Sequence, residues 1–241
     1  MSRTPAGLPC AYPRRVISTP APEPTPSGWA VRDARLVVRR LLDIAGDTGQ
    51  RPVVVAVDGR SGSGKSTVAD RIAGLVPGAV VVRTDDVAWH HSFFDWDGLL
   101  AEHVLEPVRS GEDVDYRPPG WESHDREGAI EVPASASMVV IEGVGSSRGA
   151  LADRYDAIVW VSSDEDERRR RGVIRDVELG RSPEDAEAFW DEWDSAELPF
   201  LADDRPWERA HVVVCGTPEL IGLAPGHDDL VVVSSAATAA A

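Results

Sequence analysis

The sequence predicts an α/β fold with a mainly parallel five-stranded sheet that helices cover on both faces. Two observations carry this prediction. Uninterrupted β-branched runs recur along the chain, and segments with helical spacing of apolar residues separate most of them. Runs that are apolar at every position are typical of strands buried on both faces. The five runs are residues 53–57, 79–82, 138–141, 157–161 and 211–214.

The segments outside these runs give the expected domain organisation. Residues 1–28 hold seven prolines, which predicts a flexible arm because each proline removes a backbone donor. From residue 29 the apolar spacing indicates an amphipathic helix that ends near Gly46. We expect one main domain over residues 29–225. Residues 226–241 would add a C-terminal strand and a frayed tail.

Composition narrows the class of protein. The chain has 241 residues, of which 42% are hydrophobic, enough for one sizeable core. The formal net charge of −16 argues against nucleic acid as a partner. No apolar run approaches the roughly 20 residues of a membrane helix, and the N-terminal stretch lacks the apolar core of a signal peptide. Cys10 and Cys215 match no metal spacing and are too few for a disulfide scaffold, so we expect a cytoplasmic protein.

A glycine-rich segment follows the first run directly. It matches the pattern of glycine, four residues, glycine, lysine and then serine or threonine, between a predicted strand and a predicted helix. Glycines let backbone N–H groups curl around phosphate oxygens. Lys65 would reach the β- and γ-phosphates, and Ser66 would offer its hydroxyl to Mg²⁺. The expected nucleotide-binding residues are Gly59, Ser61, Gly62, Ser63, Gly64, Lys65, Ser66 and Thr67.

This segment predicts a P-loop NTPase three-layer sandwich that binds ATP and Mg²⁺. Lys65 is the only lysine in the chain, so the lysine-containing box with which GTPases read guanine is absent from the sequence. The signature of transporter ATPases is absent as well. A P-loop names nucleotide binding rather than a reaction, so the rest of the chain must indicate the acceptor.

Carboxylates stand at the ends of two further runs. Asp85 and Asp86 follow the second run, where one of them could accept the proton of a substrate hydroxyl. The sequence leaves open which of the two does so, and both could instead cap a helix or lie in solvent. Glu142 ends the third run and is a candidate for holding Mg²⁺, unless it is an ordinary acid at a strand end.

An arginine-rich helix is expected after the fourth run. Arg168, Arg171 and Arg175 would lie on one face of it, and guanidinium groups match phosphate oxygens. We therefore expect an arginine-rich helical segment over about residues 163–200 that binds phosphate groups, with Arg171 in a catalytic role and Arg168 and Arg175 at the nucleotide. The alternative is an exposed helix laced with salt bridges.

These motifs together resemble the uridine kinase group of P-loop kinases, over about residues 51–214. The resemblance rests on the order VAVDGRSGSGKST, TDD, FFDWD, Tyr116 to Arg126 and VVIEG. It implies an ATP-dependent transfer to the 5′-hydroxyl of a nucleoside and a mobile lid that carries the arginines. By the same resemblance, Asp85 is the general base.

The resemblance also implies the acceptor residues. Asp95 would hold the ribose hydroxyls with Phe94 beside it, and Tyr116 and His124 fall in the region that lines the base pocket. The chain departs from the family where Val87 and Ala88 replace a Phe-Tyr pair. It also departs in the spacing between Tyr116 and His124. On the alternative interpretation, Tyr116 and Trp121 only anchor a proline-rich loop.

The predicted function is an ATP-dependent phosphotransferase that moves the γ-phosphate to a hydroxyl of a small metabolite, a nucleoside such as uridine or cytidine first. The alternatives are a kinase for another small alcohol or sugar, and an ATP-binding regulatory module without transfer activity. We expect a small-molecule substrate, no nucleic acid and no membrane as partners, and homo-oligomerisation is left open.

Overall fold

The structure, a computed structural model, describes residues 16–233 of the chain. The first half of the predicted arm, with Cys10, and the tail from residue 234 lie outside the described residues. Within residues 16–233, no helix is long and apolar enough to cross a membrane.

The centre of the molecule is a seven-stranded sheet in the order β1-β9-β8-β7-β2-β6-β3. The five strands from β8 to β3 pair in parallel, and β9 pairs antiparallel with β8 and β1. The strands of this sheet are β1 (Trp29–Asp33), β2 (Val53–Gly59), β3 (Ala79–Arg83), β6 (Met138–Glu142), β7 (Ala157–Ser162), β8 (Val212–Cys215) and β9 (Asp229–Val233). The predicted α/β class is therefore confirmed, but the predicted number of five strands was too small by the two antiparallel strands.

The first missed strand lies inside the pattern that predicted a helix from residue 29. Residues 29–33 form β1, because they pair along their whole length with β9. The helix α1 (Ala34–Ala45) begins only after Asp33, whose carboxylate accepts a hydrogen bond of 2.7 Å from the Arg35 N–H. The other additional strand is β9. A strand is expected here from the sequence, but in a separate C-terminal segment, whereas it belongs to the central sheet.

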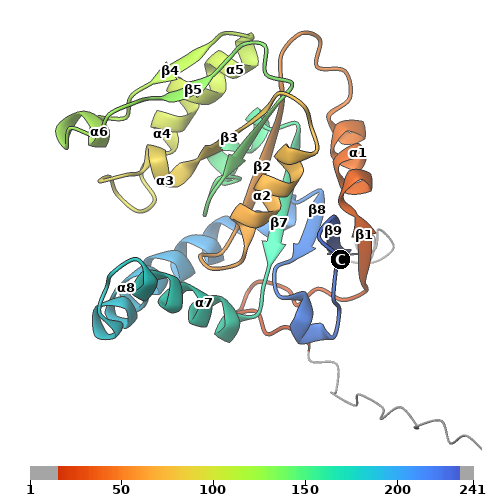
Figure 1. Cartoon of the computed structure of the whole chain (residues 1–241), viewed down its shortest axis with the longest axis vertical. Coiled ribbons are helices and arrows are strands. Elements are labelled where there is room, and N and C mark those ends of the chain that lie inside the picture. The colour runs from red at the N-terminus through yellow and green to blue at the C-terminus, as the bar shows by residue number, and fades with distance from the viewer. Residues whose placement is uncertain (1–15, 234–241) are drawn as a thin grey trace, which may run out of the picture.

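Helices cover both faces of the sheet, as Figure 1 shows. The helices α1 and α2 (Lys65–Gly74) pack on one face against Val53, Val55 and Val57 of β2. On the other face, Val54 and Ala56 meet a helical segment made of α4 (Asp97–Leu100), a π-helical stretch (Ala101–Leu105) and α5 (Glu106–Ser110). Alternate residues of β2 thus enter two different cores, which explains why the whole run is apolar.

Smaller elements complete the chain. A two-stranded sheet of β4 (Val114–Tyr116) and β5 (Ile130–Val132) flanks α6 (Pro119–Ser123). The helix α3 (Thr84–Val87) directly follows β3. The predicted lid segment forms α7 (Glu165–Glu178) and α8 (Pro183–Asp204). Short 3₁₀ turns occupy Gly149–Arg154, Pro206–Arg209 and Pro218–Ile221.

The described part of the predicted arm is anchored rather than loose. Ile17 is 1% exposed and packs beside β8 and β9. The buried carboxylate of Glu23 accepts hydrogen bonds from Trp160 Nε1 at 2.9 Å and from Ser162 Oγ at 2.8 Å. Burial raises the pKa of Glu23, although these two hydrogen bonds oppose the shift. Residues 16–28 therefore form part of the packed domain.

Candidate active site

The P-loop lies between β2 and α2 and is packed tightly on two sides. Gly62 and Gly64 have φ angles of 75° and 91°, a backbone region that favours glycine. A Cβ at Gly62 would lie 2.3 Å from the backbone oxygen of Arg168, so the lid helix α7 contacts the loop here. On the other side, a Cβ at Gly216 would lie 1.8 Å from the backbone oxygen of Ser63. The loop is thus held between the lid and the end of β8.

A cavity of about 190 Å³ lies between the P-loop and the lid. Its walls combine five predicted nucleotide-binding residues of the loop with two arginines of α7. A row of backbone N–H groups at the start of a helix, facing two guanidinium groups, is chemically suited to a phosphate chain. The lining residues are Gly62, Gly64, Lys65, Ser66, Thr67, Arg171, Gly172 and Arg175.

Three other predicted loop residues lie outside the lining of this cavity. Gly59 is the last residue of β2 and Ser63 is fully buried. The backbone N–H of Ser61 donates a hydrogen bond of 2.7 Å to Glu197 Oε1, a carboxylate of α8. In this structure these three residues support the loop from its buried side.

Arg168 also lies away from the cavity, unlike the expectation for the arginine face. Its side chain is fully buried and donates hydrogen bonds to Glu165 and, at 2.9 Å, to Asp194. Burial opposes its charge, but the hydrogen bonds to Glu165 and the charge of Glu197 raise the pKa of Arg168. The sequence pattern of α7 alone could not show this, because Asp194 and Glu197 come from α8.

Arg171 and Arg175 remain at the cavity. Arg171 donates to Glu167 at 2.8 Å and to the backbone oxygen of Gly216 at 2.8 Å. Arg175 is 56% exposed and bonds its neighbour Asp176 at 3.0 Å. Two of the three predicted arginines are therefore placed where a phosphate could reach them.

Ser66 and Glu142 meet at the edge of the sheet, as the sequence predicts. The Ser66 hydroxyl donates a hydrogen bond of 3.1 Å to Glu142 Oε1, while Arg83 Nη1 lies 2.6 Å from Glu142 Oε2. Hydroxyl and carboxylate oxygens are the hard donors that Mg²⁺ prefers. Within residues 16–233, no group of three or more His, Cys, Asp or Glu side chains could hold a metal alone. The Ser66–Glu142 pair is therefore chemically suited to contribute oxygen ligands to a Mg²⁺ site.

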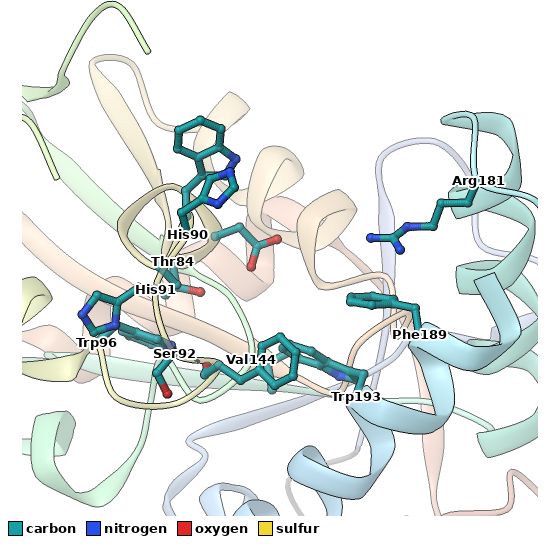
Figure 2. Close-up of a pocket in the computed structure, with 13 residues that line it drawn as sticks. Thr84, His90, His91, Ser92, Trp96, Val144, Arg181, Phe189 and Trp193 are labelled. Atoms are coloured by element: carbon teal, nitrogen blue, oxygen red, sulfur yellow. Dashed lines mark hydrogen bonds between the residues drawn. The ribbon is translucent and has the colours of Figure 1, made fainter. Parts of the chain in front are cut away.

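A second cavity, of about 440 Å³, lies beside α3 and has mostly aromatic walls. Trp89, Phe93 and Trp96 come from the segment after α3, whereas Phe189 and Trp193 come from the lid helix α8. Figure 2 shows the lid residues facing the α3 side across the cavity. Asp85 belongs to the lining. The cavity therefore presents a carboxylate to a ligand that aromatic side chains can hold.

The two adjacent aspartates differ in their surroundings. Asp86 accepts a hydrogen bond of 2.7 Å from Arg126 Nη2, so its charge is paired. Asp85 makes no side-chain hydrogen bond or ion pair with any residue from 16 to 233, and it lines the aromatic cavity. The structure thus favours Asp85 over Asp86 as the carboxylate that a substrate could reach.

Phe94 and Asp95 are not part of the lining of this cavity. Phe94 stacks on Phe200 of α8, with ring centroids 4.3 Å apart. Asp95 is exposed and makes no side-chain hydrogen bond within the described segment. The structure therefore does not place the two residues expected at the ribose in the wall of the aromatic cavity.

Tyr116 and His124 stack on different side chains. Tyr116 stacks on His103, with ring centroids 4.4 Å apart, and burial raises the pKa of its hydroxyl. His124 stacks on His90 at 3.8 Å, and His90 lines the aromatic cavity. Only His124 of this pair is connected to the cavity. Trp121 is 5% exposed and anchors its loop, as the alternative interpretation expects.

Sequence reasoning did not assign a role to the buried carboxylate of Asp58. It accepts hydrogen bonds from the backbone N–H groups of Gly59, Gly145 and Ser147 and from the Ser147 hydroxyl, at 2.7 to 2.9 Å. Burial raises the pKa of Asp58, and these hydrogen bonds oppose the shift. Asp58 thus ties the start of the P-loop to the loop after β6. The sequence signal that could have pointed to Asp58 is its place as an acid directly after the apolar run 53–57.

The lid residues of the aromatic cavity were also missed. Arg181 stacks over Phe189 with its guanidinium carbon 4.2 Å from the ring centroid, and both line the cavity. Trp190 packs the base of the lid instead, because a Cβ at Gly172 would lie 1.7 Å from its ring. The spacing of Trp190 and Trp193 in the sequence does not show which of them lines the cavity.

The fold and the paired cavities define a P-loop protein of the kinase type. No family model matches the chain. A uridine kinase from Deinococcus deserti is 32% identical over 154 residues, which are 56% of this chain and 73% of that protein. A uridine-cytidine kinase B from Dictyostelium discoideum is 26% identical over 155 residues, which are 56% of this chain and 63% of that protein.

Structural comparison gives the same fold. A crystal structure of a candidate fructose transport system kinase from Silicibacter sp. TM1040 has a TM-score of 0.56 at 20% identity. It matches 70% of this chain and 93% of that structure. On the strength of the Deinococcus relative, the chain belongs to the uridine kinase family.

Proposed function

We propose that the protein is an ATP- and Mg²⁺-dependent kinase that phosphorylates the 5′-hydroxyl of a nucleoside, uridine or cytidine first. One observation carries the proposal. The carboxylate of Asp85, which has no ion-pair partner among residues 16–233, lines an aromatic cavity at the same edge of the sheet as the P-loop and the Ser66–Glu142 pair. A base, a cavity for an acceptor and a phosphate site at one edge are the parts that phosphoryl transfer needs.

The contact between α3 and β6 supports this arrangement. A Cβ at Gly143 would lie 1.7 Å from Thr84 Oγ1, so the residue before Asp85 packs directly against the residue after Glu142. The base and the acid at the metal site therefore belong to neighbouring, tightly packed backbone segments. Such packing fixes their separation, which is the requirement for in-line transfer.

Each side chain then has a distinct task. Asp85 accepts the proton of the substrate hydroxyl as that oxygen attacks. Lys65 and Arg171 stabilise negative charge on the transferred phosphoryl group and its leaving oxygen. Ser66 and Glu142 would hold Mg²⁺, which neutralises phosphate charge when bound. The lid residues Phe189 and Trp193 exclude water from the acceptor.

The aromatic walls favour a planar acceptor. Trp89, Phe93 and Trp193 offer apolar ring faces and edges, on which a nucleobase can pack. The relatives named for uridine and cytidine point to pyrimidine nucleosides.

The test is ADP release from purified protein with ATP, Mg²⁺ and a panel of acceptors. The panel holds uridine, cytidine, fructose and pantothenate. We expect stimulation by uridine or cytidine well above the background without acceptor. Stimulation by a sugar or pantothenate alone would assign a different acceptor. ATP binding without stimulation by any acceptor would make the protein a regulatory module.

A further inference from the structure

The lid and the P-loop are joined by a group of charged side chains, which we call the buried ion cluster. It consists of two arginines and three acids: Arg60 of the loop, Glu165 and Arg168 of α7, and Asp194 and Glu197 of α8. The side chains of Arg168 and Glu197 are fully buried and that of Arg60 is 3% exposed. Such charges stay inside a protein only when they are mutually paired.

Glu197 occupies the centre of this cluster. Its Oε1 accepts two hydrogen bonds, one of 2.7 Å from the Ser61 backbone N–H and one of 3.1 Å from Trp193 Nε1. Its Oε2 lies 3.2 Å from Arg60 Nη2 and 3.5 Å from Arg168 Nη1. One carboxylate thus contacts the P-loop backbone and a wall of the aromatic cavity at the same time.

The P-loop contacts the lid helices α7 and α8 through several atoms. The Ser61 N–H bonds Glu197, and the Ser61 carbonyl accepts a hydrogen bond of 3.4 Å from Arg168 Nη1. The next residue, Gly62, is in contact with the backbone of Arg168. Both polar groups of one loop peptide segment are therefore bonded to side chains of the lid hairpin.

We propose that Glu197 is a positioning residue that holds the P-loop in its phosphate-binding shape and links it to the acceptor cavity through Trp193. Without this carboxylate, the half-buried Ser61 N–H would lose its hydrogen-bond partner, and two buried guanidinium groups would lose a counter-charge. The loop would then relax, and the N–H groups around Lys65 would no longer be ordered before ATP arrives. This inference rests on the proposed function.

The buried ion cluster limits how much of the lid can move. A lid that closes as a whole would have to break the buried ion cluster at each turnover. With the base of the hairpin held by Glu197, closure is confined to the part beyond the cluster, around Arg181 and Phe189, which line the acceptor cavity. The lid therefore organises the P-loop even when no substrate is bound.

The test is calorimetric measurement of ATP binding with Mg²⁺ and without acceptor. We expect Glu197→Ala to weaken ATP binding at least tenfold. Glu197→Gln keeps the acceptor oxygen for Ser61 but loses the charge, so we expect a loss of about threefold. Glu192→Ala is the matched control, because this exposed residue of α8 makes no side-chain hydrogen bond in the described segment.

Melting temperature, measured on the same samples, separates positioning from stability. A purely structural Glu197 would lower the melting temperature and leave the ATP affinity of the folded variants unchanged, which would overturn the proposal. If Glu197→Ala does not fold, Glu197→Gln and Arg60→Gln carry the test, and wild-type affinity in both would overturn it. An unaltered chain that binds no ATP would overturn the proposed function as well.

Trp193→Phe tests the proposed link between Glu197 and the acceptor cavity. Phenylalanine keeps a ring in the cavity but lacks the N–H that donates to Glu197. We expect the KM for the nucleoside to rise a few-fold while ATP affinity stays within twofold of wild type. An unchanged KM for the nucleoside would show that Glu197 does not serve the acceptor cavity.

Discussion

The phosphate side and the acceptor side of this site are built in different ways. The phosphate side is built on one continuous loop between β2 and α2, to which α7 adds Arg171 and Arg175, and its neighbouring charges are nearly all paired. The acceptor side is assembled from the segment after β3 and from α8, about 100 residues apart in the chain, and its carboxylate Asp85 has no described partner. A fixed phosphate site thus faces an acceptor cavity whose two walls come from separate elements.

This difference indicates which part of the site can vary when the acceptor specificity changes. The phosphate loop needs a strict local sequence, since glycines and a lysine must stand at set positions. The acceptor cavity needs only side chains of suitable shape at its walls, so residues such as Trp89 and Phe189 can change without disturbing the P-loop. The P-loop class is therefore evident from the phosphate side, whereas the choice of acceptor depends on the acceptor side.

The largest effect is expected at Lys65. Lys65→Ala removes the lysine from the phosphate cavity, and we expect kcat/KM to fall by about 1,000-fold or more, because the developing charge loses its nearest cation. Steady-state ADP release measures this. Lys65→Arg serves as the matched variant, which keeps the charge but not the compact shape. Activity of the alanine variant within tenfold of wild type would show that the cavity is not the transfer site.

The adjacent aspartates form the next test, which addresses the acceptor side directly. We expect Asp85→Asn to lower kcat by several hundred-fold, within the roughly 100- to 10,000-fold range of general base catalysis. Asp86→Asn should lower it less than about fivefold, because Asp86 is occupied by Arg126. Equal losses in the two variants, or a larger loss at Asp86, would contradict the assignment of the base.

Arg171 tests the contribution of the lid to the phosphate side. We expect Arg171→Ala to lower kcat by about 100-fold, a loss of about 2.7 kcal/mol of transition-state stabilisation. Arg170→Ala is the control, because Arg170 stands on the same helix but is 60% exposed and, among residues 16–233, pairs only with Glu167. Similar kinetics for the two variants would remove Arg171 from the mechanism.

The smallest expected effect is on the stability of the fold at acidic pH. Hydrogen bonds from Arg170, and then from Arg171, lower the pKa of Glu167 to about 2 from its usual 4.5. A lowered acid pKa stabilises the fold above pH 4.5, and this contribution is lost as the pH falls from 4.5 towards 2.

Urea denaturation across that pH range measures the contribution. We expect Glu167→Gln to lower the free energy of unfolding at pH 7 and to show a weaker decline than wild type on acidification. The control is Glu178→Gln at the exposed end of the same helix, which should decline as wild type does. Parallel curves for wild type and Glu167→Gln would contradict the shifted pKa.

The part of the fold that could be predicted is the part with a local signal. Each parallel strand contains an uninterrupted apolar run because helices cover both faces of the sheet, and the P-loop is contiguous in the sequence. β1 was mistaken for the start of a helix, since only its pairing with β9 makes it a strand. Pairing partners distant in sequence override local spacing.

The site was predictable to the same degree. Glu142 ends β6, while Lys65, Ser66 and Asp85 begin the helices that follow β2 and β3, so the topology brings all four to one edge of the sheet. Arg168 was placed wrongly and Glu197 was missed for one reason. Their partners belong to different elements, and a buried contact between α7, α8 and the P-loop leaves no periodic pattern in any one of them.

The most direct test of the central claim is product analysis by mass spectrometry after incubation with ATP, Mg²⁺ and uridine or cytidine. The account predicts a nucleoside 5′-monophosphate in amounts that match the ADP formed. It also predicts that the Asp85→Asn variant binds ATP normally and makes several hundred-fold less of this product, within the range that loss of a general base allows. ADP formation without any phosphorylated nucleoside would contradict the account.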